Sequence, residues 1–230
     1  MARRELSTFV TLWNRHKVLY SEVFSAALLN LAEKDSLFGD EDAISEILSL
    51  VLNQVCFEFS KSRNQEVQTP FWEGPVQPVT EDELRGGRIR KRPDFTCKCL
   101  NPWADSPEKH EISLHVECKR LGHPTSATWN LNENYVKNGI KRFDSKTHEY
   151  GKRAYSGMMI GYVISMTPKK IEAEVNDYQK KHLTDNTKIN FTFDATPLFK
   201  TRQDIKRKNV KPVQFELIHF WVDLRNSYRP

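Results

Sequence analysis

The segment from Ile112 to Lys119 alternates between apolar and polar residues, which constrains it to an extended strand. Side chains on successive residues of a strand point to opposite faces of the sheet. One face therefore carries Ile112, Leu114, Val116 and Cys118, and the other carries Ser113, His115, Glu117 and Lys119. The apolar face predicts a half-buried strand. The polar face projects a carboxylate and an ammonium group, two residues apart, to the same side.

A second strand is predicted to start at Pro93–Asp94, just before an apolar run. The segment Asn101–His110, which separates the two strands, is rich in turn-forming residues, so the strands are expected to form a hairpin. Asp94 would then be available beside Glu117 and Lys119. Two carboxylates and a lysine suit a magnesium-dependent phosphodiesterase, because they offer oxygen ligands to a hard cation and a positive group near the attacking water. The simpler alternative is a solvated strand face held by salt bridges.

A helix is predicted to begin after Asp40, whose side chain suits the N-cap position, with acidic residues in the first turn. Its apolar stripe consists of Ile44, Ile47, Leu48, Val51 and Val55. Glu41 shares this stripe, whereas Glu46 points nearly the opposite way. An isolated buried charge is costly, so Glu41 is expected to face a partner. Alternatively, Glu41 only complements the helix dipole.

The pattern Pro93-Asp94 … Glu117-Cys118-Lys119 resembles the PD-(D/E)XK nuclease superfamily, which has the restriction-endonuclease-like fold. The segment Gly139-Ile140-Lys141-Arg142-Phe143 and the late apolar run Leu217–Trp221, which contains His219, are similar to an uncharacterised bacterial branch of that superfamily. The resemblance covers roughly residues 39–224. It implies an α/β fold with a mixed central sheet flanked by helices.

The resemblance also implies a set of roles. Asp94 and Glu117 would bind Mg²⁺, which Mn²⁺ can replace, and the main-chain carbonyl of Cys118 would be a further ligand. Lys119 would position the attacking water. Glu41, with Glu46 as the fallback, would bind a second ion directly or through water. The implied substrate is nucleic acid, above all double-stranded DNA, cut in defence against foreign DNA.

The other predicted elements follow the same order as in this fold. Residues 1–38 are interpreted as an N-terminal helical extension, and residues 39–230 as the nuclease-like domain. The pattern predicts a short strand and a mobile basic loop within 62–92, and a helix near 132–144. It also predicts a strand at 157–165, a helix from Pro168 to about His182, and a final strand from Val213 to Leu224.

Positive charge is concentrated in two segments, although 35 Lys and Arg against 30 Asp and Glu give a net charge of only +5. The first contains Arg85, Arg88, Arg90, Lys91 and Arg92; the second contains Lys200, Arg202, Lys206, Arg207, Lys208 and Lys211. The first segment leads into Asp94, so we expect contact with a polyanionic backbone rather than a merely solvated face. The residues predicted to bind nucleic acid are Arg88, Arg90, Lys91, Arg92, Arg120 and Arg142.

The four cysteines favour buried thiols in a reducing compartment. A zinc site built from Cys97, Cys99, His115 and Cys118 would need side chains that strand alternation sends to opposite faces. Without a signal peptide or a long apolar run, the chain is expected to be cytoplasmic and free of membrane.

Two further readings of the function remain open. The chain could be a regulatory nucleic-acid-binding module that has lost turnover, or a nuclease-fold subunit that is inactive without an ATPase or recognition partner. No Walker loop or helix-turn-helix is found in the sequence, so target choice is expected to come from elsewhere. The chain is expected to be a homo-oligomer or a subunit of a complex.

Overall fold

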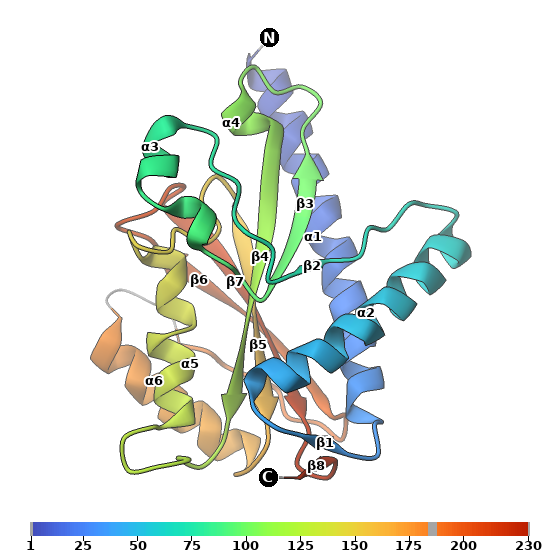
Figure 1. Cartoon of the computed structure of the whole chain (residues 1–230), viewed down its shortest axis with the longest axis vertical. Coiled ribbons are helices and arrows are strands. Elements are labelled where there is room, and N and C mark those ends of the chain that lie inside the picture. The colour runs from blue at the N-terminus through green and yellow to red at the C-terminus, as the bar shows by residue number, and fades with distance from the viewer. Residues whose placement is uncertain (1, 184–187, 230) are drawn as a thin grey trace.

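A mixed six-stranded sheet forms the centre of the molecule in the computed structural model, which describes residues 2–183 and 188–229 (Figure 1). The strands in spatial order are β2 (Phe71–Trp72), β3 (Phe95–Leu100), β4 (Glu111–Leu121), β5 (Ser156–Val163), β7 (Gln214–Asp223) and β6 (Leu198–Lys206). Strands β4, β5 and β7 run parallel, whereas the pairs β2–β3, β3–β4 and β6–β7 are antiparallel. The predicted α/β class and the β3–β4 hairpin are therefore confirmed.

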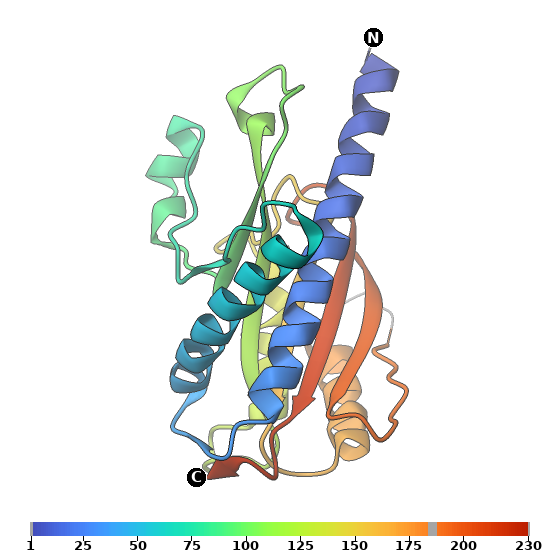
Figure 2. The ribbon, with the colours of Figure 1, turned by 90° about the vertical axis from the view of Figure 1, so that its right-hand side faces the viewer.

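Helices cover both faces of this sheet. Helices α1 (Ala2–Ala32) and α2 (Glu41–Arg63) lie on one face, and α5 (Leu131–Lys137) and α6 (Pro168–His182) lie on the other (Figures 1 and 2). The short elements are β1 (Leu37–Phe38), α3 (Glu81–Arg85), η1 (Arg88–Arg90), α4 (Pro107–His110), η2 (Ile140–Asp144) and β8 (Tyr228–Arg229), of which β1 and β8 form a small parallel pair.

Helix α1 belongs to the same hydrophobic core as the sheet. Its inward residues, including Trp13, Phe24 and Leu28, are buried in one cluster with strand residues such as Phe95. The indole N–H of Trp13 also donates to Ser156 Oγ on β5 at 3.0 Å. The predicted boundary between an extension 1–38 and a domain 39–230 therefore does not separate two cores, because α1 supplies one of the layers that bury the sheet.

Helix α2 is long and apolar enough to cross a membrane, and it is the one such helix among the described residues. A core helix can have the same length and composition, because it too needs a long apolar stripe. In this structure Ile44, Leu48 and Leu52 of α2 are buried in the core.

The helix predicted near 132–144 is divided in two. Helix α5 ends at Lys137 and the 3₁₀ helix η2 begins at Ile140. Between them, Gly139 lies so close to its surroundings that a Cβ atom there would be 2.4 Å from the carbonyl oxygen of Tyr135 and 2.5 Å from the Cε of Met159. The break aims η2, and with it Arg142, at the polar face of β4.

Strand β6 was not predicted, because Lys200 to Lys211 was interpreted only as a cationic segment. In the structure its first part is an edge strand on which Lys200, Arg202, Asp204 and Lys206 are not buried. Charged residues on an edge strand oppose unwanted pairing with other chains. This half of the segment therefore has a structural explanation for its charges.

The late strand with His219 contributes a buried polar network. His219 Nδ1 accepts from the hydroxyl of Tyr135 at 2.7 Å, and its Nε2 donates to Gln203 Oε1 at 3.0 Å. Trp221 Nε1–H donates to the same tyrosine oxygen at 3.1 Å. Burial lowers the pKa of His219 to about 3, so the ring is neutral and serves the packing of α5 on β7.

Candidate active site at the open edge of β4

The candidate site lies beside the first residue of β3, where β4 continues beyond the paired part of the hairpin. The pairing between these strands reaches only Phe95 opposite Val116, while β4 extends to Leu121. Asp94 sits immediately before β3, and its carboxylate accepts the main-chain N–H of Cys118. The Asp94 side chain thus accepts the hydrogen bond that the Cys118 N–H would otherwise donate to a neighbouring strand. Alternation of β4 puts Glu117 and Lys119 together at the same gap.

Glu41 closes the gap from the side of α2. Its Oε2 accepts the main-chain N–H of Arg120 at 3.1 Å, and its Oε1 accepts from Lys119 Nζ at 2.6 Å. The helix starts as predicted, because Asp40 caps it by accepting the N–H of Ala43. Glu46 is exposed on the other side of α2, so the structure brings Glu41 and not Glu46 to the site.

Glu117 is the buried centre of the site, with 0% of its side chain exposed. Its Oε1 contacts two cations, Lys119 Nζ at 2.8 Å and the guanidinium of Arg142 from η2. Its Oε2 is buried and has no hydrogen-bond partner. A buried carboxylate oxygen without a partner is energetically costly, so this atom is the most informative one in the site.

The electrostatics of the site leave it short of positive charge. Three carboxylates (Asp94, Glu117 and Glu41) surround two cations (Lys119 and Arg142). Burial, together with the charge of Asp94, raises the pKa of Glu117 to about 8. Burial likewise raises the pKa of Asp94 to about 6, against the attraction of Lys119. Burial opposes the charge of Lys119, but the surrounding carboxylates outweigh it and raise its pKa. A pKa of about 8 leaves Glu117 mostly protonated at pH 7, and either this proton or a bound cation relieves the imbalance.

The fit to a divalent ion can be judged from these atoms. Among the residues the structure describes, no three His, Cys, Asp or Glu side chains form a group that could hold a metal. Two carboxylates, Asp94 and Glu117, are present, and the Cys118 carbonyl accepts from Lys119 Nζ at 2.6 Å. The unpaired Oε2 of Glu117 and the excess of carboxylates fit a cation held by these three groups. Both oxygens of Glu41 already accept hydrogen bonds, so its geometry suits holding Lys119 better than holding a second ion.

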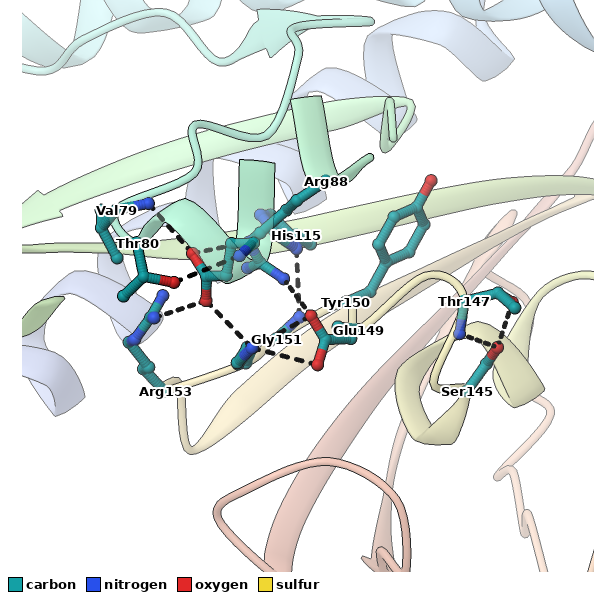
Figure 3. A network of polar contacts seen from close by, with 12 residues as sticks. Val79, Thr80, Arg88, His115, Ser145, Thr147, Glu149, Tyr150, Gly151 and Arg153 are labelled. Carbon is teal, nitrogen blue, oxygen red and sulfur yellow. Dashed lines mark hydrogen bonds and ion pairs between the residues drawn. The ribbon is translucent and has the colours of Figure 1, made fainter. Parts of the chain in front are cut away.

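Arg88 does not lie where the nucleic-acid prediction needs it. Its side chain is only 6% exposed and makes ion pairs with Glu149 at 3.1 Å and with Glu83 at 3.7 Å (Figure 3). The cationic segment 85–92 is thus partly a structural anchor. Arg90 and Arg92 are exposed and Lys91 is half-buried, so these three remain candidates for a phosphate backbone. The expected role of Arg88 is corrected, since a buried, doubly paired guanidinium is not available to a ligand.

Arg142 and Arg120, the other two cations predicted to bind nucleic acid, differ in how accessible they are to a ligand of the site. Arg142 is ion-paired with Glu117 and 27% exposed, so it lies at the boundary between the site and solvent. Arg120 reaches the other way, to the carbonyl of Gly39 and the hydroxyl of Tyr228, both at 3.4 Å. Arg142 is therefore well placed to meet a ligand of the site, and Arg120 mainly ties β4 to the C-terminal segment.

Glu83 organises the ion-pair network that contains Arg88. Its Oε2 accepts the N–H of Val79, and its Oε1 contacts Lys152 and Arg153. Burial favours the neutral acid, but these hydrogen bonds and cations outweigh it and lower the pKa of Glu83 from 4.5 to about 2. Sequence reasoning missed this cluster, because its members are far apart in the chain.

We expect Glu83→Gln to lower the free energy of unfolding by up to about 3 kcal/mol at pH 7, the value that corresponds to a pKa of about 2 in the folded and 4.5 in the unfolded chain. A lowered pKa stabilises the fold above pH 4.5, and this contribution disappears as the pH falls toward 2. Urea titrations at several pH values measure it. Glu81→Gln is the matched control, since the Glu81 side chain is 89% exposed on the same helix. Equal losses in both variants would contradict the assignment.

Arg207 is a second residue whose role could not be predicted. It was counted among the cations of the 200–211 segment, but it is 1% exposed. Its guanidinium donates to the carbonyls of Phe143, Tyr150, Gly151 and Ala154 and lies over the ring of Phe215. Arg207 thereby fixes the loop that follows Arg142.

Comparisons with models of protein families, with curated proteins and with solved structures found no match. The interpretation of the site therefore depends on its own geometry.

Proposed function

We propose that this protein is a metal-dependent phosphodiesterase that cuts nucleic acid, with double-stranded DNA as the preferred substrate. The observation that carries the proposal is the buried Glu117, whose Oε2 has no partner although Lys119 and Asp94 lie beside it. An isolated structural salt bridge would not need a buried carboxylate with a spare oxygen. A site that accepts a divalent cation does.

In this proposal Asp94, Glu117 and the Cys118 carbonyl hold Mg²⁺ or Mn²⁺. When bound, the ion would supply Lewis-acid stabilisation of charge on the phosphoryl oxygens. Lys119 would orient the attacking water and offset the developing negative charge, since its ammonium is held by Glu41 and Glu117. Glu41 would keep that ammonium in place. Arg142 would exchange its contact with Glu117 for the substrate phosphate, which a bidentate guanidinium suits well.

The finer fold assignment belongs to the same proposal. We infer a restriction-endonuclease-like arrangement from the order of the elements: the Glu41 helix, the Asp94 hairpin, the Glu117 strand, the Arg142 segment and the parallel strand β5. What supports it is that the sheet is mixed and that Asp94 and Glu41 reach the same strand edge.

A positive neighbourhood supports nucleic acid as the substrate. The pKa of His148 is lowered to about 4, mainly by burial and further by the positive charges of Arg142 and Lys91. Arg142 and Lys91 therefore lie close enough to His148 to form one positive region with it. Exposed Arg90 and Arg92 extend it along the segment before Asp94. Contacts of this kind bind phosphates without regard to base sequence.

One observation favours a second candidate function. Lys119 and Arg142 already compensate Glu117, and no three-side-chain metal group exists among the described residues. A nuclease-fold subunit that binds nucleic acid but does not cut, or cuts only with a partner protein, would retain such a compensated site. Calorimetric titration with Mn²⁺ separates the two: the proposed enzyme binds the ion and Glu117→Gln does not, whereas the non-cutting subunit binds none.

Glu41 and Glu46 give an internal comparison within one helix. Glu41→Gln is expected to lower the cleavage rate by about ten- to a hundredfold, the usual cost of losing a partner that orients a reactive group. Glu46→Gln should leave the rate unchanged, since that side chain is exposed and away from Lys119. Initial rates of plasmid nicking measure both. A larger loss in Glu46→Gln would contradict the placement of Glu41.

A further inference from the structure

A cavity lies at the far end of the β3–β4 hairpin, away from the candidate active site. It has a volume of about 610 Å³. Ile112 lines it and belongs to the opposite sheet face from Glu117, roughly 17 Å along the strand at the rise of an extended chain. This volume is within the range of small-molecule and cofactor sites.

Aromatic rings form the wall of this cavity. Phe9 from α1 packs against Tyr155, with ring centroids 6.3 Å apart, and Trp103 stands in the loop between β3 and β4. Trp103 is 50% exposed and Tyr155 is 38% exposed, so both rings present a face to a ligand. Exposed aromatic faces are platforms on which nucleobases stack.

The lining also contains basic side chains. Lys211 is exposed, whereas Lys109 is paired with Asp105 at 2.9 Å and both Lys152 and Arg153 are paired with Glu83. Lys152 and Arg153 also line the neighbouring polar pocket, which contains Lys91 and His148. The two pockets are therefore adjacent, and the second one mixes cations such as Lys91 and Lys146 with acids such as Glu83 and Glu149.

We propose that this cavity binds one unpaired nucleotide of a nucleic-acid strand, with the base on Trp103 and Tyr155 and an adjacent phosphate on the exposed Lys211. Aromatic walls with an exposed lysine at the rim match a base that carries a phosphate better than they match an uncharged apolar ligand. The inference depends on the proposed nucleic-acid substrate, but not on cleavage. It deepens that function, because the substrate would then include a single-stranded segment next to the cut site.

The test measures binding by the anisotropy of a labelled single-stranded oligonucleotide, with Ca²⁺ in place of Mg²⁺. Trp103→Ala is expected to weaken binding about tenfold, and Trp103→Phe to retain most of it, since stacking of one base is worth roughly 1–3 kcal/mol. Trp129→Ala is the matched control, because Trp129 is 48% exposed and lies outside the cavity. Binding of a blunt duplex, in which every base is already stacked, should change little in Trp103→Ala.

The possible results separate the proposed function from the assignment of the cavity. If the wild-type protein binds the blunt duplex but no single-stranded oligonucleotide, this inference fails and the proposed function stands; if it binds neither, both fail. If it binds and Trp103→Ala binds equally well, or if Trp129→Ala loses as much, only the cavity assignment is overturned. A free nucleoside monophosphate that binds as tightly as the oligonucleotide would overturn the role of the strand. Melting temperatures of the three variants close to that of the wild type confirm that the fold is intact.

Discussion

Asp94→Asn and Glu117→Gln are each expected to lower metal-dependent DNA cleavage by roughly a thousandfold or more, because Lewis-acid stabilisation of the phosphoryl oxygens is worth several kcal/mol. Both substitutions remove ligand charge at nearly constant shape. Asparagine keeps an oxygen that can accept the Cys118 N–H, and glutamine keeps one that can accept from Lys119. The fold is therefore expected to persist.

The double variant should be no worse than either single variant, since both carboxylates act through the same ion. Rates from linearised plasmid and circular dichroism spectra of all three variants provide the measurement. Wild-type turnover in either single variant would show that the carboxylates only stabilise the fold.

Lys119→Ala is expected to reduce cleavage by a similarly large factor, while DNA binding changes only slightly. The ammonium is one cation among many for phosphate attraction, but it is the one held between Glu41 and Glu117 at the candidate site. Lys119→Arg should fail as well, because a planar guanidinium cannot replace a compact ammonium beside an attacking water.

The matched control for Lys119 is Lys137→Ala, an exposed lysine on α5 that makes no part of the site. Binding by anisotropy with Ca²⁺ and cleavage with Mg²⁺ are measured on the same preparations. If Lys119→Arg keeps most of the activity, or if Lys119→Ala loses binding and cleavage in parallel, Lys119 is a contact to the DNA backbone rather than a catalytic residue.

Local periodicity was sufficient to predict the elements that build the site. The alternation from Ile112 to Lys119 defined β4 and its polar face, and the turn-rich segment 101–110 defined the hairpin. The spacing of the apolar stripe of α2 distinguished Glu41 from Glu46, because a helix fixes the direction of each side chain relative to its neighbours. These predictions depend only on residues close together in the chain.

The sequence could not predict whether each cation is paired within the fold or open to a ligand, because its partners are far away in the chain. Arg88 is paired with Glu149, Arg207 with the carbonyls of the 143–154 loop, and Arg142 with Glu117. A cationic run looks the same in the sequence whether it is solvated, paired or bound to phosphate. The open edge of β4 was equally hidden, because it arises from the difference in length between two paired strands.

The most direct test of the central claim is cleavage by the unmodified chain of 230 residues. Labelled double-stranded DNA, single-stranded DNA and RNA are each incubated with the purified protein in Mg²⁺, Mn²⁺ or EDTA, with Glu117→Gln prepared identically as a check for contaminating nuclease. The proposed function predicts cleavage of DNA in Mg²⁺ and Mn²⁺, none in EDTA and none by the variant. Cleavage that persists in EDTA, or that Glu117→Gln performs equally well, would contradict it, as would a wild-type protein that binds Mn²⁺ and DNA together but cuts no substrate.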